Sequence, residues 1–400
     1  MRQQYEPSAD RIIALYQQLE DDILSAVIRR ILKMGYVSEA SKHQLEVLQA
    51  AGLLYDDIVQ LIADRTDACT AQVKALFEDA GVQTVAIDNS LHEAAGALPI
   101  DIRQDSSTRQ VLEAGYKKTL GTMQNLVSTT ATQAQTVFIQ TCDRIYMQVS
   151  SGAFSYQEAI MNALRALADT GATVSYPTGH TDRMDVAVRR CVLTGVSQTA
   201  AAVSLRQTED AGCYLMEITA HSGARPDHAK WQGQLVSLTG KDVGKTIDGL
   251  KVWSLSGIGY GSGEGFKGWN CRHNWHAYYP GLSTPNYTPE ELKKLDEPCI
   301  SYNGKLYTEY EISQMQRAQE RRVRAWKRRC ITAQEGVNSA TDEATRATAQ
   351  AEFDRSARYL KNNEAKLKDF CRQTGQDRDR FREQVLGFGR SEAQRAVHAV

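Results

Sequence analysis

The sequence predicts a mainly α-helical protein with a small α+β domain near the middle of the chain. Apolar residues recur at three- and four-residue spacing through most of the first 210 residues and again after about 308. Between 221 and 281 the chain is loop-rich and contains four of its five tryptophans. A length of 400 residues favours several folding units. We therefore divide the chain into an N-terminal helical region (1–210), a compact α+β domain (211–310) and a basic helix with a helical tail (311–400).

The composition excludes several classes of protein. Hydrophobic residues make up 42% of the chain, which is enough for buried cores, and the 47 basic and 48 acidic side chains nearly cancel. None of the eight cysteines has C-x-x-C spacing, which excludes a zinc ribbon or a thioredoxin-type motif, and their scattered positions indicate assembly in a reducing cytoplasm. The first residues lack the apolar core of a signal peptide, and no apolar run reaches about 18 residues, so we expect no membrane span.

The helices of the first region can be placed by their apolar spacing. One apolar stripe predicts a helix of about six turns ending at Gly35, with Ser8 or Asp10 as its N-cap. Shorter helices are expected after it, and a further one toward the end of the region. The shorter helices cover about 39–51, 53–65 and 68–80; Gly52 and Asp67 separate them, and Gly81 ends the last of them. The later helix covers about 178–209.

The stretch from about 103 to 170 is rich in Thr, Ser, Gln and Ala and has few large apolar side chains. Small residues let helix backbones approach closely, so one interpretation is packing against a second copy or another protein. The other interpretation is a poorly packed surface helix. The residues alone leave both open.

The middle domain is expected to begin with a strand at 213–220. The glycine-rich loop 257–265 lacks the strand and helix that would flank a dinucleotide fingerprint, so it more simply lets the backbone pass close to a tryptophan or a partner. Residues 300–307 form a predicted hairpin with Asn303-Gly304 as its turn.

Residues that could hold a metal gather in two segments of this domain, 221–233 (HSGARPDHAKWQG) and 268–276 (GWNCRHNWH). Imidazole, thiolate and carboxylate are the usual zinc ligands, so zinc is the metal that this set fits. In the alternative interpretation, Asp227 caps a helix that starts at Ala229, while the cysteine and histidines only pack among the tryptophans. The predicted ligands are Asp227, His228, Cys271 and His273, with His221 and His276 in reserve.

A basic helix is expected at 317–329, where seven side chains are basic and one is acidic. Such a helix could follow DNA phosphates by charge, dock on an acidic partner, or present a solvated face. Trp326 is expected to pack against the middle domain. The sparse apolar residues after 335 suggest an exposed, salt-bridged helical tail that orders against another subunit. The predicted nucleic-acid-binding stripe is Arg317, Arg321, Arg324 and Arg328.

The groups HSGARPDHAKWQG and GFKGWNCRH, followed by Tyr-Pro-Gly and an Arg-rich helix, resemble the phage minor capsid protein 2 family, and more distantly the phage Mu F-like head morphogenesis proteins. The resemblance spans about residues 5–335. It implies a virion component present in few copies, associated with the portal inside the head. It supplies no catalytic residues.

We therefore expect a structural protein of the virion, located in the capsid interior or portal region, that acts in head assembly and in genome packaging or ejection. Its expected partners are the portal protein, other head proteins and packaged double-stranded DNA, and it is expected to be multimeric in the particle. The rival hypothesis is an enzyme, a metal-dependent nuclease or other hydrolase built on Asp227, His228 and the segment 270–276, with His228 as general base.

Overall fold

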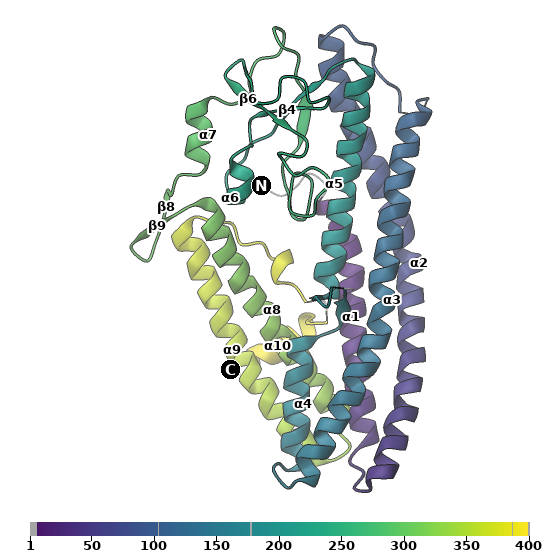
Figure 1. Cartoon of the computed structure of the whole chain (residues 1–400). Coiled ribbons are helices and arrows are strands. Elements are labelled where there is room, and N and C mark those ends of the chain that lie inside the picture. Colours follow the sequence, from purple (N-terminus) through teal and green to yellow (C-terminus); the bar gives the residue numbers. More distant parts are fainter. Residues whose placement is uncertain (1–5, 103, 177, 386, 399–400) are drawn as a thin grey trace. The chain divides into compact units, whose positions relative to one another are not determined.

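The computed structural model describes residues 6–102, 104–176, 178–385 and 387–398. As predicted, the described chain is mainly α-helical, with a small sheet region near the middle (Figure 1). The helices are α1 (Glu6–Met34), α2 (Ala40–Ala94), α3 (Ser106–Ser150), α4 (Tyr156–Thr170), α5 (Met184–Asp210), α6 (Pro226–Ala229), α7 (Pro289–Leu295), α8 (Glu309–Ser339), α9 (Glu343–Thr374), the 3₁₀ turn η1 (Phe381–Glu383) and α10 (Arg390–His398). The strands are β1 (Thr173–Ser175), β2 (Thr181–Arg183), β3 (Leu215–Ile218), β4 (Leu235–Ser237), β5 (Thr246–Ile247), β6 (Leu250–Ser254), β7 (Trp275–Ala277), β8 (Ile300–Tyr302) and β9 (Lys305–Tyr307).

The chain divides into two compact units, each built from separate segments of the sequence. Unit 1 contains Met1–Ile12, Thr70–Met123 and Arg189–Gln314, and therefore the whole of the five-stranded sheet. Unit 2 contains Ile13–Cys69, Gln124–Val188 and Met315–Val400. The division at 210 and 310 matches the change from helices to strands and back, but as a domain division it stays a prediction.

Helices in the first region are longer than predicted. The predicted helices at 39–51, 53–65 and 68–80 are one continuous helix, α2, which runs through Gly52, Asp67 and Gly81. A glycine inside a helix costs only about 1 kcal/mol. Burial of a continuous apolar stripe offsets that cost, and in unit 2 the stripe of α2 consists of Val47, Ala51, Leu54 and Ile58.

The ends of the first helix were predicted half correctly. Gly35 ends α1 with a positive φ of 67°, as expected. The proposed N-caps are wrong, because α1 begins at Glu6 and positions 8 and 10 lie inside it. Asp10 instead pairs with Arg189, at 3.6 Å between Oδ1 and Nη1. The helix predicted at 178–209 begins later, at Met184, because residues 181–183 pair with β1 as the strand β2.

Unit 1 contains a mixed sheet in the order β5-β6-β4-β3-β7. Strand β3 is antiparallel to β4 and β7, while β4 and β6 are parallel. Side chains along the strands of this sheet alternate between two apolar clusters, so both faces of the sheet are covered. The larger cluster contains Met216, Ile218, Trp231, Trp275 and Ala201 of α5, and it borders the candidate metal site.

The hairpin β8–β9 has the predicted turn. Ile300 pairs with Tyr307, and Asn303 and Gly304 have φ values of 48° and 75°. Two consecutive positive φ values define the type I′ turn that the dipeptide Asn-Gly favours.

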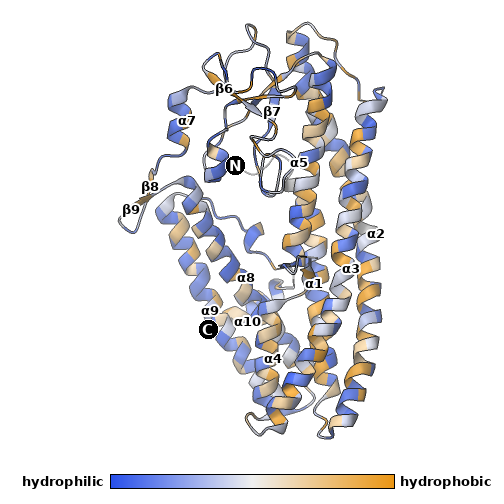
Figure 2. Ribbon diagram, viewed as in Figure 1, coloured by the Kyte–Doolittle hydropathy of each residue, from blue (hydrophilic) through white to orange (hydrophobic). Residues whose placement is uncertain are grey.

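The C-terminal helices are part of unit 2. Figure 2 shows that α8 and α9 are mostly hydrophilic along their length. Nevertheless α9 buries Phe353, Leu360, Leu367 and Phe370 within this chain. The predicted helical tail is therefore confirmed, but the expectation that it is exposed and orders against another subunit is wrong. Trp326 stacks on Tyr359 of α9 at 4.5 Å between ring centroids. Its expected packing against the middle domain stays a prediction.

Candidate metal centre and basic helix

The two His- and Cys-bearing segments meet because they are attached to neighbouring strands. The first segment follows β3, and the second leads into β7. Ile218 of β3 lies opposite Trp275 of β7. The pairing continues past the strand ends, where the Thr219 N–H donates to the Asn274 carbonyl and the Thr219 hydroxyl accepts from the Asn274 N–H at 2.8 Å. The sheet register therefore places the segments side by side.

Three of the four predicted metal ligands come together. The ligand atoms of His228, Cys271 and His273 all lie within 4.8 Å of one another. Cys271 Sγ lies 3.6 Å from His273 Nδ1, and the His228 and His273 ring centroids are 5.4 Å apart. All three residues are at most 3% exposed.

The fourth predicted ligand, Asp227, lies outside this cluster. Its side chain is 56% exposed, and its carboxylate contacts Arg225 Nε at 3.4 Å and lies 3.9 Å from His228 Nε2. The helical turn α6 begins at Pro226 and not at Ala229, so the capping alternative in its predicted form is wrong. Pro226 occupies the first helical position, where a missing N–H has little effect.

The two reserve histidines have different positions. The His221 ring lies 4.4 Å from the His273 ring, so this residue packs against the cluster of His228, Cys271 and His273. His276 follows Trp275 on the strand and therefore points to the other face of the sheet, where its Nε2 lies 3.4 Å from Glu217 and 2.9 Å from Asn286 Nδ2.

Each imidazole of the cluster has an oxygen beside one ring nitrogen. His221 Nδ1 lies 2.9 Å from the Ser222 carbonyl, and His273 Nε2 lies 3.3 Å from Gln232 Oε1. His228 Nε2 lies 2.8 Å from the Glu264 carbonyl, to which Arg225 also donates. The Arg225 Nη2 lies 2.6 Å from the same His228 nitrogen. A ring N–H that faces an oxygen leaves the lone pair on the other nitrogen of the ring.

Burial determines the electrostatics of the cluster. Desolvation lowers the pKa of His221 and His228, and it lowers the pKa of His273 to about 2. Burial likewise raises the pKa of the Cys271 thiol. The three imidazoles are therefore neutral at neutral pH.

A buried lysine next to the cluster was not predicted. Lys267 is 4% exposed, has a φ of 60°, and donates from Nζ to Ser197 Oγ at 3.2 Å. Burial lowers its pKa to about 8. No periodic pattern reveals such a residue, because it lies in a loop among glycines.

The glycine-rich loop passes close to a tryptophan, as one of its predicted roles required. A Cβ on Gly263 would lie 2.8 Å from the ring of Trp269. A Cβ on Gly265 would lie 2.0 Å from the Gly259 carbonyl oxygen. The loop is therefore folded tightly on itself, and glycine is required at both positions.

The four arginines of α8 do not form one exposed stripe. Arg321 is exposed and Arg317 is half-buried, but the side chains of Arg324 and Arg328 are only 18% and 6% exposed. Arg328 lies 3.6 Å from Glu20 and 3.7 Å from Asp185, and Arg324 lies 3.8 Å from Asp185. The expectation of a continuous DNA-facing stripe is corrected for Arg324 and Arg328, which pair with buried acids inside unit 2.

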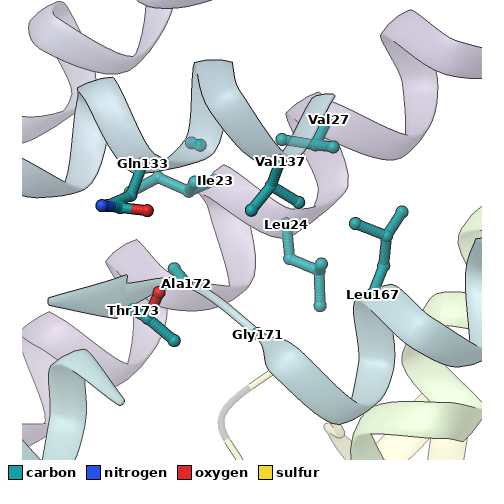
Figure 3. Close-up of a pocket in the computed structure, with 10 residues that line it drawn as sticks. Ile23, Leu24, Val27, Gln133, Val137, Leu167, Gly171, Ala172 and Thr173 are labelled. Atoms are coloured by element: carbon teal, nitrogen blue, oxygen red, sulfur yellow. The ribbon is translucent and has the colours of Figure 1, made fainter. Parts of the chain in front are cut away.

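The cavity drawn in Figure 3 is small and lined mainly by apolar groups. It has a volume of about 10 Å³ in unit 2 and is bordered by Leu24, Val27, Val137 and Leu167. One water molecule needs about 10–15 Å³, so this cavity has no room for a substrate.

Within the part of the chain that the structure describes, no helix is both long and apolar enough to cross a membrane.

Comparison with known proteins identifies the family. The model of the family "Phage minor capsid protein 2" matches residues 2–372. A "Structural protein" of Lactococcus phage LL-H is 25% identical over 333 residues, covering 80% of this chain and 86% of that protein. A "Structural protein" of Lactococcus phage mv4 is 37% identical over 84 residues, covering 21% of this chain and 59% of that protein. No solved structure matches the chain. Because the family model covers nearly the whole sequence, this chain belongs to the phage minor capsid protein 2 family.

Proposed function

We propose that this chain, a structural protein of the phage virion, acts inside the head at the portal during assembly, and during packaging or ejection of the genome. The observation that supports a binding role is a row of exposed apolar side chains on α2. Leu45, Leu48 and Val59 are 58%, 61% and 43% exposed. Their spacing places them on one helix face, apart from the buried stripe of the same helix. An exposed apolar row of this kind marks a protein contact.

Co-purification with the portal protein of the same phage tests the proposal. The portal and the full chain are expressed together, and the retained chain is quantified. Leu45→Glu with Leu48→Glu should reduce retention at least tenfold, because the contact would bury two charges. Lys361→Glu adds acidic charge to an exposed site on α9 and should leave retention unchanged. Full retention of the double variant would exclude this face as the portal contact.

We also propose contact between α8 and packaged double-stranded DNA, now restricted to its exposed arginines. Arg321 and the adjacent Arg322 are exposed and can reach phosphates. Each lost phosphate contact should reduce the slope of log affinity against log salt by about 1. Gel-shift titrations over a salt series should therefore show weaker binding for Arg321→Ala and Arg322→Ala. The exposed Arg358→Ala on α9 is the control. Equal binding by all three variants would contradict the proposal.

We infer that the chain acts by binding and not by turnover. Catalysis by a metal needs an open coordination position, whereas His228, Cys271 and His273 are buried. The nuclease hypothesis can be tested directly by incubating the chain with plasmid DNA and magnesium, manganese or zinc. We expect intact plasmid. Cleavage that His228→Ala abolishes would overturn this inference.

A further inference from the structure

We propose that His221, His228, Cys271 and His273 bind one structural zinc ion, with His221 taking the place that the sequence suggested for Asp227. The proposal goes beyond the virion role, since it concerns how unit 1 is held together. It rests on the positions of four side chains from two segments, whose nearest members, His228 and Cys271, are 43 positions apart (271 − 228) in the chain.

The geometry of the cluster supports a closed site. The ligand atoms of His228, Cys271 and His273 lie within 4.8 Å of one another, and the His221 ring lies 4.4 Å from that of His273. Zinc sites place four N or S ligands about 2.0–2.3 Å from the ion, which requires neighbouring ligand atoms about 3.3–3.8 Å apart. The 3.6 Å between Cys271 Sγ and His273 Nδ1 already meets this requirement.

A buried polar atom supports His221 as the fourth ligand. His221 Nε2 is shielded from solvent and has no hydrogen-bond partner among the described residues. Its Nδ1 faces the Ser222 carbonyl, so Nε2 carries the lone pair. An unpaired buried nitrogen is unfavourable, and a metal ion would satisfy it. Asp227, by contrast, is solvated and paired with Arg225.

The surrounding oxygens match the second shell of a zinc site. Histidines that bind zinc usually donate their other N–H to a carbonyl or carboxylate, which fixes the ring. Here the acceptors are the Ser222 and Glu264 carbonyls and Gln232 Oε1. The available nitrogens are therefore Nε2 of His221 and Nδ1 of His273. Nδ1 of His228 is available in the tautomer that donates from Nε2 to the Glu264 carbonyl. Binding releases the Cys271 proton to solvent, so the ligand is a thiolate.

Burial indicates a structural ion and not a catalytic one. Trp231 covers the cluster, with its ring 4.5 Å from His228 and 4.8 Å from His273. The strands of the sheet in unit 1 are at most five residues long, and long loops connect them. A small loop-rich module of this kind gains much of its stability from a metal that joins its segments.

Metal analysis of the purified full-length chain tests the proposal. We expect one zinc per chain in the wild type and less than a tenth of that in Cys271→Ser and His273→Ala. His221→Ala should lower the zinc content, whereas Asp227→Asn should not. His276→Ala is the matched control, since this histidine of the same module lies on the other face of the sheet and should retain full zinc. Retention by His221→Ala together with loss by Asp227→Asn would overturn the ligand set.

Cobalt substitution keeps the test decisive if a variant fails to fold. The wild-type chain stripped of zinc and titrated with Co²⁺ should show the thiolate-to-cobalt absorption of a tetrahedral site, saturating at one equivalent. Chelation of zinc should also lower the thermal unfolding temperature of the wild type. A folded wild type that contains no zinc and gives no cobalt absorption would overturn the metal site. The portal proposal would survive that result, because it is tested separately by retention on the portal protein.

Discussion

Arg328 lies on a strongly basic helix, yet its guanidinium is buried within unit 2. It belongs to a cluster in which three acids, Glu20, Asp21 and Asp185, surround three arginines, Arg183, Arg324 and Arg328. Glu20 also accepts from Arg183 Nη1 at 3.0 Å. The opposite charges of these groups make burial tolerable, but removal of one partner leaves a charge without compensation.

Replacement of Arg328 by methionine should therefore destabilise the protein by about 3–5 kcal/mol. Methionine keeps most of the volume, so the loss would come from the unpaired Glu20 and Asp185. Arg321→Met on the same helix should change stability by less than about 0.5 kcal/mol, because Arg321 is exposed. Urea unfolding followed by circular dichroism measures both. Similar stability of the two variants would show that the buried pairs contribute little.

Asp21 gives unit 2 a distinct pH dependence. Burial raises its pKa from 3.8 to about 7, while the Gly387 N–H and Arg328 oppose the rise. The folded state then binds more protons than the unfolded state between these values. The contribution of Asp21 to the free energy of unfolding therefore falls as the pH rises from about 4 to 7.

Asp21→Asn should remove this decrease in the free energy of unfolding with rising pH. Asparagine keeps an oxygen that can accept from the Gly387 N–H, a bond of 2.7 Å in the wild type. Relative to the wild type, the variant should gain about 1–3 kcal/mol at pH 8 and little or nothing at pH 4. The free energy of unfolding is measured for the variant and the wild type at a series of pH values. Contributions from other titrating groups cancel in the difference between the two proteins. A constant difference across the series would contradict the assigned pKa.

At the scale of elements, α3 and α5 interlock within unit 1 through reciprocal glycine and threonine pairs. A Cβ on Gly115 of α3 would lie 2.0 Å from Thr199 Oγ1 of α5, and a Cβ on Gly195 of α5 would lie 2.1 Å from Thr119 Oγ1 of α3. The small residues of α3 therefore allow close packing, as one interpretation of the sequence held. At these positions the neighbour is another helix of the same chain.

Gly115→Ala should destabilise the protein by about 1–3 kcal/mol, because Thr199 Cβ itself would lie only 2.9 Å away. Adding Thr199→Gly should recover part of the loss in a double-mutant cycle. Gly121→Ala is the control on the same helix. Among the described residues no atom lies within 4 Å of a Cβ at position 121, so helix propensity should make this variant more stable by about 0.5–1 kcal/mol. Thermal unfolding distinguishes these outcomes, and equal effects at 115 and 121 would exclude the interlock.

At the scale of the whole molecule, the C-terminal segment completes the core of unit 2. Helix α9 contributes Phe353, which is 1% exposed, and Glu352 of the same helix accepts from Arg165 of α4 at 2.7 Å. These contacts join parts of the chain that are 187 residues apart. Unit 2 therefore packs a C-terminal helix, α9, against a helix from the middle of the chain, α4.

Phe353→Ala should consequently lower the free energy of unfolding by about 3–5 kcal/mol, as expected for loss of a fully buried phenylalanine. Lys361→Ala, at an exposed position of the same helix, should stay within about 0.5 kcal/mol of the wild type. Urea unfolding measures both. A small effect of Phe353→Ala would indicate that α9 is a separable appendage.

Much of the fold was predictable from local patterns. Apolar spacing indicated α1, a short apolar run at 213–220 indicated a strand of the sheet region, and Asn303-Gly304 indicated the β8–β9 turn. The ends of the helices were less predictable. Gly52 and Gly81 destabilise a helix only slightly, and the packing of α2 outweighs that cost. The two His- and Cys-bearing segments were predictable from residue type. The position of Asp227 outside their cluster was not, since it depends on how the turn at Pro226 directs its side chains.

The sequence by itself determined the helical class, the family and the residue types that meet beside the sheet, because these follow from periodicity and from motifs that are local in the chain. Only the tertiary structure decided which charges are buried. Arg321 and Arg328 look alike in the sequence, yet one faces solvent and the other pairs with Glu20 and Asp185. The reason is that burial and charge pairing depend on residues more than 100 positions away, which no local pattern encodes.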